Sequence, residues 1–355
     1  MLEIVVIGNL CEKILSIEDI LTLVFMLKNM ILGNTCNNVV SFTNALWLAT
    51  TLNSTLIAPR YMYKIFQEFN LSTLHSSYCF QTIDQYNAHS KKRSLRSYYL
   101  RTVSGAESFF LFKIFENPKF KHQLPLFDQN TMMEMSRHYV RVYAAFWSSP
   151  MRGILPASEH LIKNHLDDSL TYTTVHKRSM EGACNEAIAG TAITDYSDEE
   201  LPMKNSEWNL MPKLNPICDM SPSFVNDTVT MHGRQNNKVF ISFDGRGDIK
   251  PMTDLGHVIS KVLDQESDYK AVPRKYLDAF LAIHGGLFIL NPRSTFSWQI
   301  YIVREILGLQ SVPILKNNDY LVMDQVEYRR EKRTGLVVSW TQIADSARRA
   351  RLALF

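Results

Sequence analysis

The stretch GGLFILNPRSTFSWQIYIVREILGLQ, residues 285–310, decides the fold that the sequence predicts. Its run Leu287–Leu290 is short, apolar and uninterrupted, which is typical of a strand buried on both faces. Polar residues at 291–295 interrupt this run, and apolar residues then recur at helical spacing at Phe296, Ile300, Val303 and Leu307. Gly308 ends the periodicity, as expected for a helix C-cap. The stretch therefore predicts a strand, a hydroxyl-rich turn and a helix.

A turn of this kind can bind an anion. The first N–H groups of a helix and the positive end of its dipole attract phosphate. The hydroxyl groups of Ser294, Thr295 and Ser297 would add hydrogen-bond donors at the same place. The alternative is that Ser294 or Thr295 is an ordinary N-cap residue of an ordinary βα unit.

Length and composition limit the class of protein. A chain of 355 residues favours about two domains, and 46% apolar with 21% charged residues indicates a globular protein with a full core. The net charge of +3 gives no reason to expect a nucleic-acid partner. Five cysteines without CxxC or paired Cys/His spacing predict no zinc site and leave disulfides open. The longest apolar stretch, residues 20–32, contains Lys28 and is too short for a membrane span, and no signal peptide or anchor is visible.

The first half of the chain predicts a helix over residues 42–52 and a buried strand over residues 56–59. Residues 33–38, GNTCNN, precede them and suit either a ligand-binding loop or a plain turn. Residues 89–101 combine basic and aromatic side chains, a pattern found in single-stranded nucleic-acid sites, but the near-neutral net charge favours a solvated loop. A helix is expected over residues 131–147, and the composition shift at 148–156 marks a domain boundary.

In the second half, the β-rich residues 170–175 lead into His176 and Arg178, which project to the same side of an extended backbone. A bidentate guanidinium beside an imidazole suits a pyrophosphate, although a histidine at a strand end can also be structural. A helix is expected over 180–191, an aperiodic excursion over 192–236, and a strand over 238–243. Asp244 follows that strand and would bind a ribose or base, or cap the next turn. Further predictions are a helix over 274–284, edge strands over 312–315 and 320–323, and a basic amphipathic helix over 341–355.

Three strand ends in the second half thus carry polar side chains: His176 with Arg178, Asp244, and Ser294 with Thr295. Ligands of open α/β sheets bind outside the carboxyl ends of the strands. Together these ends favour a nucleotide–diphosphate site. Neither a GxGxxG fingerprint nor a P-loop is present.

Three motifs give the chain a family resemblance. The first is the segment around Asn37-Asn38, with the helix that follows it and the strand ending Leu56-Ile57-Ala58-Pro59. The second is the H-x-R run His176-Lys177-Arg178. The third is the run Phe288-Ile289-Leu290-Asn291, continued by Ser294-Thr295-Phe296-Ser297. These motifs resemble those of the fucosyltransferase superfamily, which includes protein O-fucosyltransferases and α-1,6-fucosyltransferases. In the first motif, spacing favours Asn37 as the family's asparagine, whereas Gly33-Asn34 matches its letters better.

The resemblance implies an α/β fold with two Rossmann-like domains facing across a cleft (GT-B type). The expected ranges are residues 1–155 on the acceptor side, 156–340 for the nucleotide sugar, and 341–355 for a terminal helix. It implies transfer of fucose from GDP-fucose to a glycan or glycoprotein in the secretory pathway. No DxD motif stands on a loop where it would hold a divalent metal, so the sequence predicts transfer without metal or other cofactor.

Site residues follow from the resemblance too. Arg178 would bind the β-phosphate, His176 would orient or donate to phosphate, and Asn37 or Asn38 would position the acceptor hydroxyl. Ser294, Thr295 and Ser297 would hold phosphate, with Phe296 near the base and Asp244 on the nucleoside. The chain departs from the family at Gly286, where an acidic residue is common. The alternative is therefore a catalytically degenerate protein that binds the nucleotide sugar without turnover.

Overall fold

The computed structural model of the chain describes residues 24–28, 35–52, 55–58, 72–75, 77–82, 84–85, 100–104, 129–147, 153–166, 171–177, 222–232, 238–245, 248–291, 294–313 and 340–352. The chain divides into an amino-terminal unit, residues 1–149 with 330–346, and a carboxyl-terminal unit, residues 150–329 with 347–355. The division at residue 150 falls inside the stretch in which the composition shifts. Within the described parts, no helix combines the length and the apolar character that crossing a membrane requires.

The amino-terminal unit contains a parallel four-stranded sheet with the order β3-β2-β1-β4. Its strands are β1 (Val24–Lys28), β2 (Thr55–Ala58), β3 (Phe80–Thr82) and β4 (Leu100–Ser104). Apart from the last described helix of the chain, its described helices are α2 (Thr35–Thr51), α4 (Ser72–His75) and α9 (Gln129–Trp147). The strand order 3-2-1-4 is the beginning of the Rossmann order 3-2-1-4-5-6. Phe42 of α2 meets Phe80 and Phe146 edge to face, with ring centroids 5.5 and 5.9 Å apart, so one side chain joins α2 to both β3 and α9.

One prediction in this unit is wrong. Residues 35–38 were expected in a loop, but α2 begins at Thr35 and places Asn37 and Asn38 in its first turn. The reason is that Cys36, Val39 and Val40 are all buried, at helical spacing, so core packing extends the helix towards its amino end. The strand β4 also begins within the predicted basic loop, at Leu100. The other residues of that loop lie outside the described residues.

The carboxyl-terminal unit contains a second parallel sheet, with the order β6-β5-β7-β8. Its strands are β5 (Thr173–Lys177), β6 (Val239–Phe243), β7 (Leu287–Leu290) and β8 (Gln310–Pro313). Two parallel sheets confirm the α/β class. The chain crosses first from β5 to β6 and then back over β5 to β7, so the direction of winding reverses between β5 and β7.

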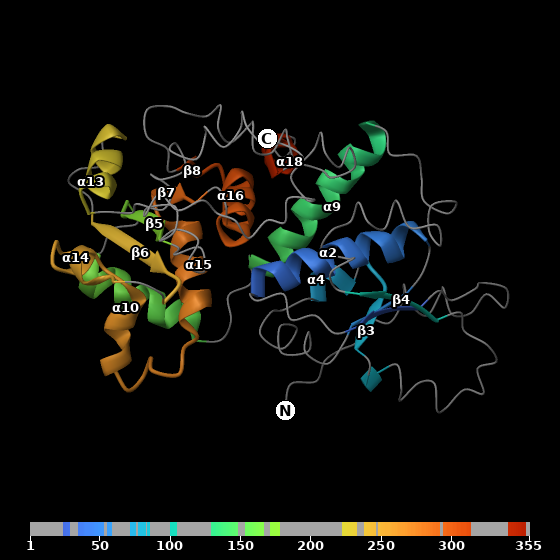
Figure 1. Cartoon of the computed structure of the whole chain (residues 1–355), viewed down its shortest axis with the longest axis horizontal. Helices are drawn as coiled ribbons and strands as arrows, with labels where there is room; N and C mark the ends of the chain where they lie inside the picture. The colour runs from blue at the N-terminus through green and yellow to red at the C-terminus, as the bar shows by residue number, and fades with distance from the viewer. Residues whose placement is uncertain are drawn as a thin grey trace, which may run out of the picture. The chain divides into compact units, whose positions relative to one another are not determined.

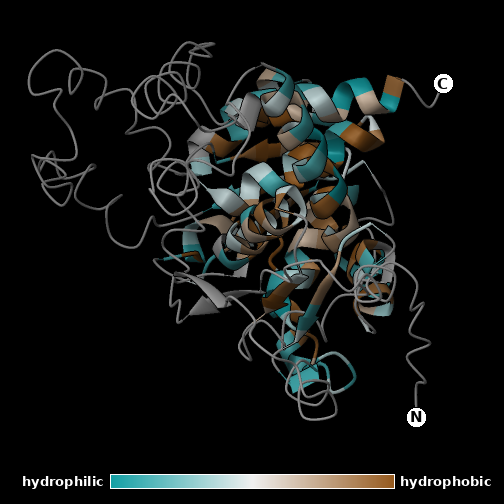
Figure 2. Ribbon diagram, turned by 90° about the vertical axis from the view of Figure 1, so that its right-hand side faces the viewer, coloured by the Kyte–Doolittle hydropathy of each residue, from teal (hydrophilic) through white to brown (hydrophobic). Residues whose placement is uncertain are grey.

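Side chains alternate along these strands and give the sheet two apolar faces. Val175, Ile241 and Ile289 pack with Val225 and Val229 of α13 on one face. On the opposite face lie α10, α15 and α16, which pack on one another and on the strands, and Figure 1 shows α13 and α10 on opposite sides of the sheet. The described helices of this unit are α10 (Ile154–His165), α13 (Pro222–Met231), α14 (Lys250–Thr253), the 3-10 helix η3 (Ser260–Gln265), α15 (Arg274–His284), α16 (Thr295–Leu307) and part of α18 (Trp340–Leu352). These helices are amphipathic: Figure 2 shows hydrophilic and hydrophobic residues on different sides of them.

Most elements of the second half were predicted correctly. The helix over 274–284 and the strand over 287–290 have the predicted bounds, and Gly308 caps α16 with a φ of 73°. The prediction of an aperiodic excursion over 192–236 is wrong in part, because α13 lies within it. That helix has ten residues, and of its apolar residues Val225 and Val229 belong to the core cluster. One such pair is too short a pattern to count as periodic. The predicted helix over 180–191 and strand over 320–323 lie outside the described residues.

Arg304 holds this unit together in a way that the sequence did not reveal. Its guanidinium is fully buried, and burial lowers its pKa to about 10. It donates hydrogen bonds to the carbonyl oxygens of Ala282, Ile283, Gly285, Gly286 and Gln310 and to the hydroxyl of Ser311. A cation at these carbonyls is favoured by the negative end of the α15 dipole. Arg304 therefore ties α16 to the end of α15, to the residues before β7 and to the start of β8.

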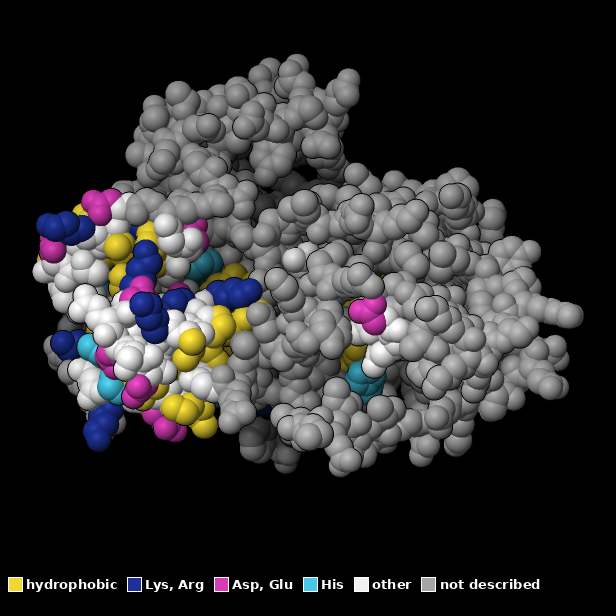
Figure 3. Space-filling model, turned by 90° about the horizontal axis from the view of Figure 1, so that it is seen from below, with side chains coloured by type: hydrophobic (Ala, Val, Ile, Leu, Met, Phe, Trp, Pro, Cys, Tyr) yellow, Lys and Arg dark blue, Asp and Glu magenta, His cyan; other side chains and the backbone are white. Residues whose placement is uncertain are grey.

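Charges are mixed on the surface of this unit. In Figure 3, basic and acidic side chains of the described residues alternate over the carboxyl-terminal unit. A single-sign field of the kind that attracts nucleic acid is not formed by the described residues on that face.

Candidate functional site

The candidate site lies at the carboxyl ends of β5 and β7. These two strands are neighbours, and the order of the sheet reverses between them. In open α/β sheets the crevice outside the strand ends at such a switch point is the place where ligands bind. Four residues separate the end of β7 from the first turn of α16, so a helix amino end is also present there.

The hydroxyl group of Ser297 connects the end of β5 to the end of β7. The side chain of His176 is 5% exposed, and its Nδ1 lies 2.6 Å from Ser297 Oγ. The backbone N–H of Asn291 donates to the same oxygen at 3.0 Å. The ring of Phe296 lies against His176, with centroids 4.8 Å apart. The end of β5, the end of β7 and the first turn of α16 are therefore fixed relative to one another.

Ser294 is the N-cap of α16. Its backbone is extended, and its Oγ accepts a hydrogen bond from Ser297 N at 3.5 Å. The sequence left open whether Ser294 or Thr295 has this role, and the structure assigns it to Ser294. Ser294 and Ser297 are fully buried and bonded to protein atoms, whereas Thr295 and Phe296 are partly exposed. Thr295 is therefore the most solvent-exposed of the three predicted hydroxyl residues, Ser294, Thr295 and Ser297.

The end of β6 adds an exposed carboxylate. Asp244 follows Phe243, and its backbone N–H lies 3.4 Å from the carbonyl oxygen of Lys177 at the end of β5. The sequence predicted that Asp244 either binds a ribose or base or caps the next turn. Residues 246–247 of that turn lie outside the described residues, so both roles of Asp244 stay predictions. Further along the chain, Asp248 Oδ1 accepts a hydrogen bond from Lys250 N at 2.9 Å at the start of α14. Asp244 itself remains exposed beside the end of β5.

Asp278 is a buried carboxylate near this edge that sequence reasoning missed. Its Oδ2 accepts hydrogen bonds from Phe243 N at 3.3 Å and from Ser242 Oγ at 3.4 Å, and Ser242 is the register partner of His176. Burial raises the pKa of Asp278 to about 7, and the hydrogen bonds and Arg274 oppose this effect. A usable signal existed, because Asp278 shares a helix face with the apolar residues Leu281 and Ala282.

Gly286 occupies the position where the resembling family often has an acidic residue. A Cβ atom at Gly286 would lie 3.0 Å from the Cα and the carbonyl oxygen of Thr171, and one at Gly285 would lie 2.8 Å from the Tyr172 ring. The backbone before β7 is therefore packed directly against the backbone before β5. An acidic side chain at residue 286 would require the two segments to separate.

The side chains of the other two predicted site residues, Arg178 and Asn37, are not described by the structure. Arg178 lies outside the described residues. Asn37 lies in the first turn of α2 in the amino-terminal unit, and its side chain is not described. The structure thus brings together His176, Ser294, Phe296 and Ser297, places Asp244 at the next strand end, and leaves the roles of Arg178 and Asn37 as predictions.

Comparisons with known proteins give the following results. No protein-family model matches the sequence, and a comparison with curated proteins finds no match. Among solved structures, the chain is similar to the apo-form of POFUT1, with a TM-score of 0.49, 14% sequence identity, and coverage of 83% of this chain and 98% of that one. It is similar to POFUT1 in complex with GDP-fucose (TM-score 0.49, 16% identity, coverage of 83% and 98%) and to POFUT1 in complex with GDP (TM-score 0.48, 15% identity, coverage of 83% and 98%). The fold class given above rests on the strand order and parallel pairing of this chain, and not on this likeness.

Proposed function

We propose that the chain is a glycosyltransferase of GT-B type that transfers fucose from GDP-fucose to a hydroxyl group of a glycan or protein. The observation that supports this most is the hydrogen bond between His176 and Ser297 at the switch point of the second sheet. It joins the H-x-R motif to the S-T-F-S motif, the two segments that carry most of the sequence resemblance. Because β5 and β7 are neighbours, this hydrogen bond holds the two motifs together at the strand ends where ligands of open α/β sheets bind.

The chemistry of the transfer explains why these groups would be needed. Breaking the bond between the sugar and the diphosphate places negative charge on the leaving nucleotide. Donors that are already oriented stabilise this charge more in the transition state than in the ground state. In the proposal, these donors are Arg178, the backbone N–H groups of the first turn of α16 and the partly exposed Thr295.

The hydrogen bonds of Ser297 assign a role to His176 in this proposal. Ser297 Oγ already accepts from Asn291 N, so its own proton can be donated to Nδ1 of His176. The imidazole then carries its proton on Nε2 and can donate it in a hydrogen bond to a phosphate oxygen. His176 is thus proposed to bind the diphosphate, and Ser297 to select the tautomer that can do so.

The remaining parts of the proposal rest on the sequence, through the family resemblance and the absence of a DxD motif. Asn37 would position the acceptor hydroxyl, Asp244 would contact the nucleoside, and the reaction would proceed without a metal ion, so EDTA should leave the transfer rate unchanged. Location in the secretory pathway agrees with the disulfide-bonded state of Cys79, because disulfides persist in oxidising compartments.

The test is Arg178→Ala, assayed for transfer from GDP-fucose across an acceptor panel. Removing one such donor should lower kcat by at least ~10²-fold. Lys177→Ala is the matched control, since it removes a neighbouring cation from the same motif and should retain activity. Equal turnover in wild type and Arg178→Ala would refute the proposed roles. Binding of GDP-fucose by wild type without any transfer would instead identify the degenerate binding protein.

A further inference from the structure

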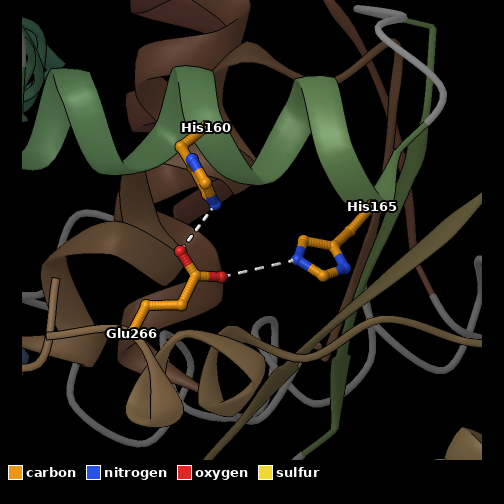
Figure 4. A group of neighbouring side chains, drawn as sticks. All are labelled: His160, His165 and Glu266. Carbon is orange, nitrogen blue, oxygen red and sulfur yellow. Dashed lines mark ion pairs between the residues drawn. The ribbon is translucent and has the colours of Figure 1, made fainter. Parts of the chain in front are cut away.

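Three potential metal ligands converge on the surface of the carboxyl-terminal unit. His160 and His165 lie on α10, and Glu266 follows η3 (Figure 4). Among the described residues, this is the one group of three or more such side chains whose ligand atoms lie close together. His165 is the last residue of α10, which leads to the amino end of β5, whereas His176 lies near the carboxyl end of that strand. The group is thus separate from the candidate transfer site.

The distances are close to those of a metal site. His160 Nε2 lies 2.6 Å from Glu266 Oε2, His165 Nε2 lies 3.9 Å from Glu266 Oε1, and one ligand atom from each residue lies within 4.8 Å of the others. Zinc with bonds of ~2.0–2.1 Å in tetrahedral geometry holds neighbouring ligand atoms about 3.3 Å apart. Small rotations of the three side chains would therefore provide this spacing, without movement of the backbone.

The backbone around the group is held in place. The carbonyl oxygen of Glu266 accepts hydrogen bonds from Tyr269 N and Lys270 N, both at 3.1 Å. The His160 ring lies against the Tyr269 ring, with centroids 4.8 Å apart. The three ligand side chains are 29–33% exposed, so an ion from solvent can reach them.

We propose that His160, His165 and Glu266 bind a divalent transition-metal ion of the zinc class and that this ion tethers the turn after η3 to α10. Two imidazole nitrogens select such an ion over Mg²⁺ and Ca²⁺, which prefer oxygen ligands. The carboxylate of Glu266 supplies negative charge, and a fourth position is left for water. The sequence predicted no zinc site because its cysteines lack CxxC or paired Cys/His spacing. His160 and His165 give no such signal, because histidines five residues apart do not share a face of a regular helix, and Glu266 is distant in sequence.

The test measures zinc binding to the full chain by calorimetry and by the shift in Tm. We expect one Zn²⁺ per chain at this site and a higher Tm in its presence, with no comparable effect of Mg²⁺ at the same concentration. His165→Ala and Glu266→Gln should each weaken this binding by at least ~10-fold, as loss of a group that supports a metal site does. His232→Ala is the matched control, because His232 lies at the end of α13 outside the group, and it should bind zinc as wild type does.

A second measurement covers a variant that fails to fold. Zinc should shift the ring ¹⁵N resonances of His160 and His165 in the wild-type protein, and Co²⁺ should give the visible absorption of a site with nitrogen ligands. Unchanged ring resonances, or equal zinc affinity in wild type, His165→Ala and Glu266→Gln, would show that the group is an ion pair only. The binding of GDP-fucose does not depend on this result, so the metal site and the proposed function can fail separately.

Discussion

Ser297→Ala should weaken both the stability of the carboxyl-terminal unit and its binding of the donor. The substitution removes two hydrogen bonds from a fully buried oxygen, one with His176 Nδ1 and one from Asn291 N. Removing one partner of a buried hydrogen bond costs about 1–3 kcal/mol. Both bonds together should therefore lower the free energy of unfolding by roughly 2–4 kcal/mol. Because the imidazole of His176 loses its orientation, the Kd for GDP-fucose should also rise by at least ~10-fold, which corresponds to about 1.4 kcal/mol.

Urea denaturation and calorimetric titration with GDP-fucose measure these two effects. Ser158→Ala is the matched control, because Ser158 is also a fully buried serine of the same unit. Its hydroxyl donates to the carbonyl oxygen of Leu155 within α10 and does not take part in the candidate site. We expect a smaller loss of stability for this variant, on the order of 1 kcal/mol, and an unchanged Kd.

A double-mutant cycle with His176→Ala tests the reasoning directly. If the hydrogen bond at 2.6 Å connects the two motifs, the single effects will not add, and the coupling free energy will lie at about 0.5–3 kcal/mol. Additive effects within ~0.5 kcal/mol, or a normal Kd for Ser297→Ala, would refute the role given to this hydroxyl group.

Three further predictions concern buried charges and protons, and urea denaturation between pH 4 and 8 tests all of them. Burial raises the pKa of Asp278 from 3.8 in the unfolded chain to about 7, so the folded state keeps the proton to a higher pH. The free energy of unfolding should therefore fall by about 4 kcal/mol as the pH rises from 3.8 to 7. Asp278→Asn should abolish this dependence on pH. Burial lowers the pKa of His138 from 6.5 to about 4, so the folded state resists protonation of this side chain. The free energy of unfolding should therefore fall by about 3 kcal/mol as the pH drops from 6.5 to 4, and His138→Gln should lack this loss. Because the two effects oppose each other in wild type, each is measured as a difference from its variant: a pH profile equal to that of wild type in Asp278→Asn, or in His138→Gln, would contradict the corresponding assignment. Arg304→Met should cost at least ~3 kcal/mol at all pH values, because it leaves buried carbonyl groups without their charged donor; a cost below 1 kcal/mol would show that water replaces it.

The fold could be predicted where periodicity runs long enough. Residues 274–284, 287–290 and 295–307 form a continuous helix–strand–helix pattern with clear ends, and the structure has these elements. The start of α2 and the presence of α13 could not be predicted, because burial of a few residues determines them and local composition does not. The role of Arg304 also depends on carbonyl groups brought together only by the fold.

The candidate site shows the same limit. The residue types at the strand ends suggested an anion site, and the turn chemistry correctly made Ser294 a candidate N-cap. The strand order that places His176 beside Ser297 was not available from the sequence, and neither was the approach of Asp278 to the end of β6. A sequence shows which side chains follow a strand, whereas the order of the strands decides which of them meet.

The central claim is that the carboxyl ends of β5 and β7 hold the diphosphate of a guanine nucleotide sugar. The most direct measurement is the shift in Tm with GDP-fucose, UDP-glucose and ADP-glucose, for wild type and for His176→Ala. A ligand that binds only the folded state raises Tm, and at 100 times its Kd the stabilisation is ~2.7 kcal/mol. We predict a rise in Tm with GDP-fucose alone, and its loss in His176→Ala. An equal response to all three nucleotide sugars, no response to any, or a full response in His176→Ala would contradict the claim.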